Sequence, residues 1–204
     1  MTAGPRCTPR TQAALGLALC VLLAWPPLRH ALEASMWRHM VLQFPLLMAA
    51  GALLAAALPP RARGAVARWN AHGIAGLVGV AGVLAVLMVP RALDLVLRDG
   101  AIDAAKYAAL VLAGAALRLS WRAAGLVVQG FFLGNVLPMT AVVGQLYIDA
   151  PLRLCNAYLL DDQARLGQWL IALAVLLALG WLAQVGWWMV QREGAAAPLG
   201  PTTP

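Results

Sequence analysis

Four side chains with metal-binding or hydrogen-bonding groups share one helical face early in the chain. Spacings of three and four residues place them on the same side of an α-helix: Met36, His39, Met40 and Gln43. Thioether sulfur suits Cu(I) and imidazole suits Cu(I) or Cu(II), whereas zinc or iron sites call for more histidine or carboxylate than this segment offers. Copper is therefore the metal that this segment would suit. The alternative is that the methionines fill gaps between helices, while His39 forms a hydrogen bond at the membrane surface.

Three further groups are expected near this segment if the helices form a suitable bundle. Met88 lies near the outer end of a later apolar run, and His30 and Cys155 lie in predicted outer loops. A lone methionine usually fills a core and a free cysteine usually behaves as a small buried hydrophobe. Both the metal-binding and the packing interpretation stay open for these residues.

Two aspartates are candidates at the same outer face. Asp162 leads into the last apolar run, where a carboxylate accepts from first-turn amides and favours the positive helix end. Helix capping is therefore the favoured role for Asp162 or its neighbour Asp161. Asp103 lies one turn from Asp99, and we interpret this region as a solvated rim in which the acids pair with nearby bases, Lys106 and Arg98.

The composition places these residues in a membrane protein. Of 204 residues, 62% are hydrophobic and only 11% are charged, against a charged fraction of about 25% in soluble domains. The formal charge of +7 comes from arginines scattered between apolar runs, so membrane lipid is an expected partner and nucleic acid is not. The three cysteines show no C-x-x-C spacing, so the sequence indicates neither a disulfide framework nor a zinc site.

Six apolar runs predict an all-α fold, a polytopic transmembrane bundle of about six helices. We place the bundle at residues 13–191, between a cytoplasmic N-terminal tail at 1–12 and a disordered cytoplasmic tail at 192–204, which has little to bury. The six runs are Ala13 to Trp25, Met40 to Leu58, Gly73 to Val89, Ala104 to Leu119, Ala123 to Tyr147 and Leu166 to Val190.

The first three runs carry local signals. The first is short, and two interpretations are open: an uncleaved anchor, which we favour because no small-x-small site directly follows, or a signal peptide. In the second, Pro45 cannot donate to the carbonyl of Val41, which predicts a kink near its start. In the third, glycines at three-residue intervals predict a smooth strip for close helix packing: Gly73, Gly76, Gly79 and Gly82.

Arginine placement predicts that both termini face the cytoplasm. Arginines gather in the N-terminal tail, in the connection after the second run and in the connection after the fourth. Seven of the eight acids fall in the remaining connections, on the predicted outer side: Glu33, Asp94, Asp99, Asp103, Asp149, Asp161 and Asp162. Polar chemistry is therefore expected at the outer ends of the helices.

Three short motifs, spread over roughly residues 35 to 175, carry a resemblance to a known family. His39-Met40, followed by Pro45-Leu46-Leu47, is similar to a histidine-methionine helix that leads into a proline-leucine stretch. Met88-Val89-Pro90 is similar to a tryptophan-histidine-x-proline segment, and Asp162-Gln163 with Gly167 to a closing aspartate-glutamine helix. Together they resemble the CtaG-like family of assembly factors for haem-copper cytochrome oxidases. Asp103 and Tyr107 stand where that family usually has a histidine pair.

The resemblance implies a multi-pass protein of the bacterial plasma membrane that assists cytochrome c oxidase assembly and is not an enzyme. Its expected action is to handle copper at the outer face, with a haem-copper oxidase subunit or a periplasmic copper chaperone as partner. Copper is the expected cofactor and haem is not, because three histidines at unsuitable depths do not form a bis-histidine site. The implied metal ligands are Met36, His39, Met40, Met88, Asp103 and Asp162.

Two other function classes compete with this prediction. One is a structural or docking subunit of a respiratory membrane complex that binds no metal. The other is a transporter, for which polar groups and a proline in the fifth run are the indication: Gln129, Asn135, Pro138 and Thr140. We favour a structural interpretation of those four, with a kink at the proline and hydrogen bonds to neighbouring groups. The sequence shows no grouping of a nucleophile with a base.

Overall fold

Prolines lie at the start of four of the described helices. Each occupies the first or second position after a non-helical residue, where its missing N–H costs no hydrogen bond. The computed structural model describes residues 8–196 and shows no strand in that range. Its elements are α1 (Pro9–Ala24), α2 (Pro26–Glu33), the π-helical turn η1 (Arg38–Gln43), α3 (Phe44–Leu54), the 3-10 turn η2 (Ala55–Ala57), α4 (Pro60–Trp69), α5 (Ile74–Leu87), α6 (Pro90–Arg98), α7 (Gly100–Asp149) and α8 (Leu160–Ala196).

The predicted polytopic helical bundle is confirmed. Among the described residues, three helical stretches are long and apolar enough to cross a membrane: 38–57, α7 and α8. Two bent pairs also satisfy this test when each counts as one span, α1 with α2 at 70° and α4 with α5 at 84°. All six apolar runs predicted from the sequence are helical.

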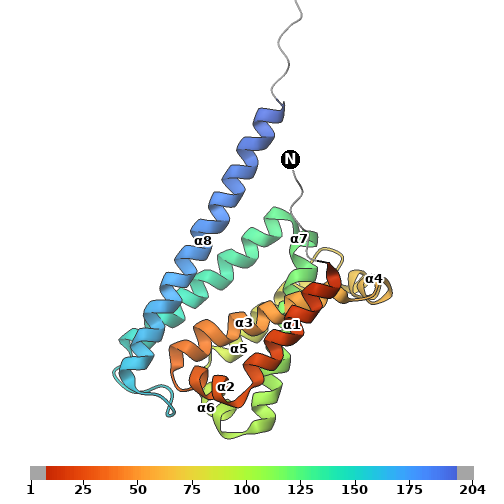
Figure 1. Cartoon of the computed structure of the whole chain (residues 1–204). Helices are drawn as coiled ribbons and strands as arrows, with labels where there is room; N and C mark the ends of the chain where they lie inside the picture. Colours follow the sequence, from red (N-terminus) through yellow and green to blue (C-terminus); the bar gives the residue numbers. More distant parts are fainter. Residues whose placement is uncertain (1–7, 197–204) are drawn as a thin grey trace, which may run out of the picture.

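Gly125 divides the longest helix into two limbs. Its φ of 62° and ψ of 175° lie outside helical geometry, in a region that glycine adopts without the steric cost of a Cβ. The first limb (100–124) contacts α5 and the second limb (126–149) runs back beside α8, as Figure 1 shows. The predicted fourth and fifth runs are thus one hairpin whose limbs meet at a single residue.

Glycines bring backbones into close contact at two helix crossings. At the crossing of α3 with the first limb, a Cβ on Gly51 would overlap the carbonyl of Val111, and one on Gly114 would overlap the carbonyl of Met48. At the crossing of the second limb with α8, Gly144 and Gly167 face one another in the same way. α7 therefore packs closely against the helices on both of its sides.

The predicted glycine strip on α5 is only half correct. Gly73 and Gly76 do lie against the first limb of α7, where an added Cβ would meet Ser120. An added Cβ on Gly79 or Gly82 would have no atom within 4 Å. The three-residue spacing turns each successive glycine further round the helix, so the strip leaves the interface after its first two members.

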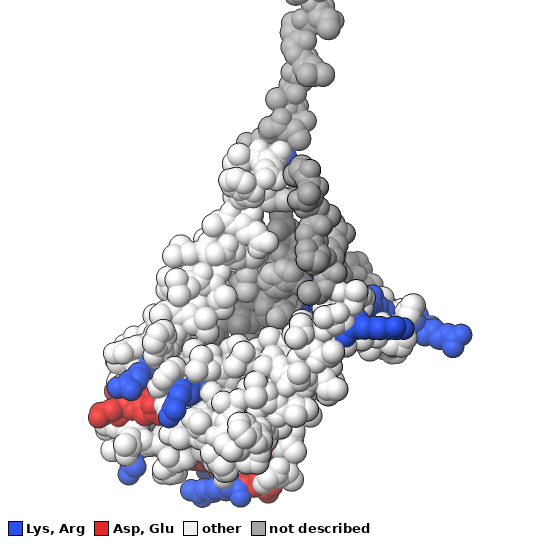
Figure 2. Space-filling view, in the orientation of Figure 1, with Lys and Arg blue, Asp and Glu red and all other residues white. Residues whose placement is uncertain are grey.

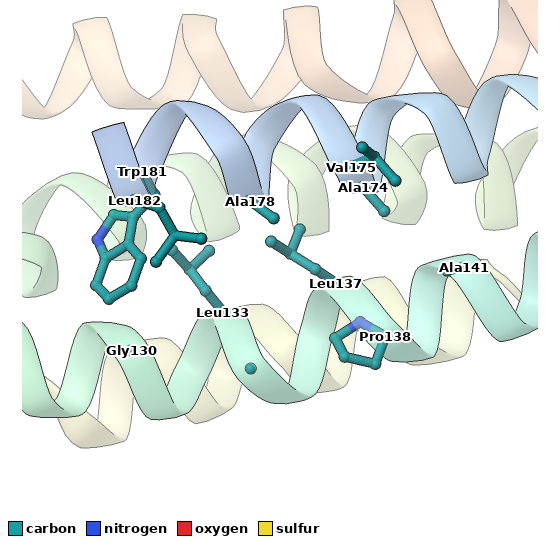
Figure 3. Close-up of a pocket in the computed structure, with 11 residues that line it drawn as sticks. Gly130, Leu133, Leu137, Pro138, Ala141, Ala174, Val175, Ala178, Trp181 and Leu182 are labelled. Carbon is teal, nitrogen blue, oxygen red and sulfur yellow. The ribbon is translucent and has the colours of Figure 1, made fainter. Parts of the chain in front are cut away.

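Between the Gly144 crossing and Gly125, α7 and α8 leave space between them. Figure 3 shows Leu133 and Leu137 of the second limb opposite Ala178 and Trp181 of α8, around an apolar pocket of about 330 Å³. The polar residues predicted as possible transporter groups bond locally to backbone instead. Side chains of Gln129, Asn135 and Thr140 donate to carbonyl groups four or eight residues earlier in the same helix.

Charged residues gather at two ends of the molecule. Figure 2 shows basic side chains projecting beside α4, while acidic and basic side chains occur together at the opposite end, with a largely uncharged surface between. That opposite end contains α2, α6 and the loop 150–159 between α7 and α8. We call it the α6 end, and the end with Arg61, Arg63 and Arg68 the α4 end.

The helical boundaries at both termini differ from the predicted domain limits. α1 begins at Pro9, inside the predicted tail 1–12, because Thr8 caps it by accepting from the amide of Thr11 at 3.2 Å. α8 continues to Ala196, beyond the predicted limit at residue 191. The rest of both predicted tails, residues 1–7 and 197–204, lies outside the described residues.

Candidate functional site

The only lysine of the chain lies buried near the start of the first limb of α7, with its side chain 1% exposed. Its ammonium Nζ has four groups within 3.1 Å: Glu33 Oε1 at 3.0 Å, His39 Nε2 at 2.9 Å, Gln43 Oε1 at 3.1 Å and Asp103 Oδ1 at 2.8 Å. The predicted solvated rim at Lys106 and Asp103 is therefore wrong. Packing by α2, η1 and α7 covers both residues.

An ammonium group carries three protons, and here three acceptors are aligned to receive them. Glu33, His39 and Gln43 accept hydrogen bonds from Lys106. Asp103 Oδ1 is close enough for an ion pair, yet it is the one buried side-chain oxygen or nitrogen among the described residues without a hydrogen bond. We call the group of Glu33, His39, Gln43, Asp103 and Lys106 the lysine centre.

Arg29 completes the charge balance of the lysine centre. It lies one turn before Glu33 on the same face of α2, and it pairs with Glu33 at 3.2 Å and with Asp103 at 2.8 Å. Two cations thus face two carboxylates, and the sum of their charges is zero. Burial of an unpaired charge is costly, so a neutral group of this kind is the arrangement that an apolar bundle tolerates.

His39 is held as a neutral imidazole by its two partners. Its Nε2 accepts from the ammonium of Lys106, so the ring proton resides on Nδ1, 2.9 Å from the hydroxyl of Tyr158. Tyr158 in turn donates to the carbonyl oxygen of Glu33 at 2.9 Å. The chain from Lys106 through His39 and Tyr158 therefore ends on the backbone of α2, and it connects α2, η1, α7 and the loop before α8.

Local sequence explains how His39 and Gln43 come to face α7. Pro45 lacks the amide proton that would bond to Val41, and the distortion predicted there takes the form of the π-helical turn η1. Gln43 is completely buried, and its amide nitrogen donates to the hydroxyl of Tyr107 at 2.9 Å. Tyr107 then donates to the carbonyl of Leu23 in α1 at 2.8 Å.

The predicted sulfur ligands lie in the apolar core. Met36 and Met40 are buried with Leu47, Leu110 and other hydrophobic side chains, and Met88 packs against this cluster from the end of α5. The backbone carbonyl of Met88 accepts from the Tyr147 hydroxyl at 2.9 Å. Of the six predicted ligands, the structure brings His39 and Asp103 together around Lys106. It places Met36 and Met40 in the hydrophobic core and Met88 against the edge of that core.

Asp162 caps a helix, but a different one from its own. Its carboxylate accepts from the hydroxyl of Ser35 at 2.7 Å and from the backbone amide of Met36, at the start of the helical segment that leads into η1. Capping was predicted for α8 because Asp162 directly precedes its apolar run. Since α8 already begins at Leu160, the carboxylate lies inside its first turn and reaches across to the neighbouring helix.

Asp94 fixes the loop 150–159 to α6. It accepts from the thiol of Cys155 and from the backbone amides of Asn156 and Ala157, at 2.9 to 3.1 Å. Burial opposes ionisation of Asp94, but these hydrogen bonds outweigh burial and keep its pKa below the usual value. Burial and the hydrogen bond to Asp94 raise the pKa of Cys155 to about 12, so the thiol stays protonated and donates. Cys155 therefore has a structural partner.

The chain matches no family model, no curated protein and no solved structure. Within residues 8–196, no group of three or more histidine, cysteine, aspartate or glutamate side chains is arranged to hold a metal ion. The resemblance to the CtaG-like family thus rests on the sequence motifs alone.

Sequence reasoning missed three members of this region, Glu33, Lys106 and Tyr158. One signal was available for Lys106, because a single lysine beside a long apolar run is an ionisable group at membrane depth, and such a group needs a partner. No pattern in the sequence connects Tyr158 to His39, since 119 residues separate them.

Proposed function

We propose that the protein assists assembly of a haem-copper oxidase in the bacterial plasma membrane as a docking partner, and that Lys106 closes its polar centre in place of a metal. The partner class follows from the sequence motifs that resemble the CtaG-like family. The choice of docking over copper transfer follows from one observation, the position of the Lys106 ammonium among Glu33, His39 and Asp103.

The distances around Lys106 are those of hydrogen bonds and ion pairs to an ammonium nitrogen. Bonds from protein nitrogen or oxygen to zinc, magnesium or calcium measure about 2.0 to 2.6 Å. The four groups around Nζ lie at 2.8 to 3.1 Å, which is the range of hydrogen bonds to an ammonium nitrogen. A metal ion at this position would require Lys106 to leave and the surrounding helices to move inward.

The α6 end offers a surface for docking. Loop 150–159 is held by Asp94 and by Gln163, which accepts from the amide of Leu154 at 2.8 Å. Even so, the loop exposes large apolar side chains, with Leu152 75% and Leu159 70% accessible. A loop that is fixed in place while presenting leucines is typical of a protein interaction site.

The first test is co-purification of oxidase subunits with a tagged full-length chain. We expect oxidase subunits to be retained in the presence of a copper chelator, and Leu152→Glu to reduce their recovery. Arg153→Glu, next to it in the same exposed loop, is the control, because it introduces the same acidic side chain without removing an apolar one. Absence of oxidase subunits from the wild-type sample would refute the proposal.

Copper handling is tested separately by anaerobic loading of the purified protein with Cu(I). Docking without metal predicts no copper above the background of a His39→Ala variant. If wild-type protein retains copper, and His39→Ala and Met88→Ala both lower its affinity, then the ligand set predicted from the sequence is correct and Lys106 must leave its position on loading.

A further inference from the structure

A large cavity lies on the other side of the bundle core, between α3, α5, both limbs of α7 and α8. Its volume of about 840 Å³ falls within the range of small-molecule sites. Its walls are apolar, with Phe44, Met48, Leu84 and Leu133 among them. The hydroxyl of Thr140 is already committed, since it donates to the carbonyl of Val136 at 2.8 Å. The body of the cavity therefore suits a hydrocarbon chain.

Charge is confined to one end of this cavity. Among its described lining residues only Arg118 and Arg122 are charged, and both lie in the last turns of the first limb of α7, towards the α4 end. Met40 and Met88 line the opposite end, next to the lysine centre. The shape is therefore amphipathic, with a long apolar body and a cationic rim.

The length of the cavity matches one leaflet of a membrane. Met40 and Ala52 both line it, and twelve residues of helix span about 18 Å. Half of a hydrocarbon core of about 30 Å is about 15 Å. An acyl chain that starts at the arginines would thus reach the far end of the cavity.

The arginines have donor groups to spare, and no described carboxylate forms an ion pair with them. Arg118 donates to the carbonyl of Ala52 at 2.9 Å and to Gln12 at 2.8 Å, which leaves other N–H groups of its guanidinium free. Arg122 makes no hydrogen bond or ion pair with any described residue. Seven of the eight acids lie in α2, in or just after α6, or at the ends of α7 and α8 next to loop 150–159 or α6. Arg122 is exposed, so its guanidinium is open to an anion from outside the described chain.

We propose that this cavity binds an anionic phospholipid from the leaflet on the α4 side, which the arginine distribution assigns to the cytoplasm. An acyl chain fills the space between α3 and α8, and the phosphate binds Arg122 together with the free N–H groups of Arg118. A neutral amphiphile would fit the apolar walls but would offer no negative charge to the guanidinium of Arg122. This site is independent of the proposed docking function.

The test measures thermal unfolding of the full-length protein in mild detergent with added phosphatidylglycerol or phosphatidylcholine. Phosphatidylglycerol should raise the unfolding midpoint of wild type more than phosphatidylcholine does. Arg122→Gln should abolish that preference, whereas Arg68→Gln, an arginine of α4 that does not line the cavity, should keep it. Equal shifts with both lipids, or an unchanged preference in Arg122→Gln, would overturn the proposal.

A second variant tests the apolar part of the site. Leu84→Trp places a larger side chain in the cavity while both arginines remain. Lipid extracted from purified wild type should be enriched in anionic phospholipid relative to the surrounding membrane, and Leu84→Trp should lower the amount retained. Retention at the wild-type level would show that the lipid binds elsewhere.

Discussion

The Nζ atom of Lys106 lies 2.9 Å from Nε2 of His39, so an ammonium group occupies the position where the sequence predicted that the histidine would bind copper. A cation that is part of the chain cannot be exchanged or removed by a chelator. The charges of the lysine centre and Arg29 therefore balance through side chains of the protein, without a bound ion.

Lys106→Met should strongly destabilise the protein, because it leaves Glu33 and Asp103 with one cation between them. Removal of one partner from a buried ion pair costs about 3 to 5 kcal/mol. The double variant Lys106→Met with Glu33→Gln restores neutrality, so its loss should be smaller than the sum of the two single losses. Denaturant unfolding of all four proteins in the same detergent measures this coupling. Strictly additive losses would show that the charges do not act together.

Gly51→Ala should destabilise the crossing of α3 and α7. The added methyl group overlaps the carbonyl of Val111, and overpacking of this kind costs about 1 to 3 kcal/mol. Gly79→Ala is the matched control, because it adds the same group to a helix where nothing lies within 4 Å. We expect the control to match or exceed wild-type stability in thermal unfolding, since alanine favours helix. Equal losses in both variants would contradict the close crossing.

Asp94→Asn should loosen the loop 150–159, at a cost of about 1.5 to 3 kcal/mol for weakened hydrogen bonds to a charged acceptor. The pKa of Asp94 is lowered in the folded state, so its contribution is complete above the unfolded value of 3.8 and is lost as pH falls through the lower, folded value. The difference in thermal midpoint between wild type and Asp94→Asn should therefore be large at pH 6 and vanish in strong acid. A difference that grows in acid would reverse the assigned sign.

The orientation predicted from arginine placement can be tested by labelling in intact cells. In a background with serine at the three native cysteine positions, Arg153→Cys in loop 150–159 should react with a membrane-impermeant maleimide. Gly64→Cys in α4, where an added side chain meets nothing within 4 Å, should react only after the cells are opened. The reverse pattern would place both termini outside.

The positions of the helices could be predicted from the hydropathy of the sequence. All six apolar runs are helical, because each must satisfy its own backbone hydrogen bonds in lipid. The prediction could not foresee that the fourth and fifth runs are one helix broken at Gly125, since φ at a glycine is decided by packing. Hydropathy also does not distinguish Gly73 and Gly76, which lie in the interface with α7, from Gly79 and Gly82, which lie outside it.

The candidate site was predicted less well, for a physical reason. His39 and Asp103 were identified by residue type, and the structure does bring them together. Their roles depend on Lys106, which the sequence pattern assigned to solvent because charged residues near helix ends are usually exposed. Asp162 was likewise assigned to its own helix, whereas its partner is the amide of Met36, 126 residues earlier. Contacts of that separation have no local signature.

The hydrogen bond between Asp162 and the amide of Met36 depends on the order in which the chain is synthesised. The ribosome synthesises η1, α3 and α7 before it reaches Asp162 in α8. The amide of Met36 therefore acquires this acceptor only after α8 has begun to form. A chain that ended before residue 160 would lack the carboxylate that caps the helical segment entering η1. α8, the last helix to be synthesised, therefore supplies the cap for that segment.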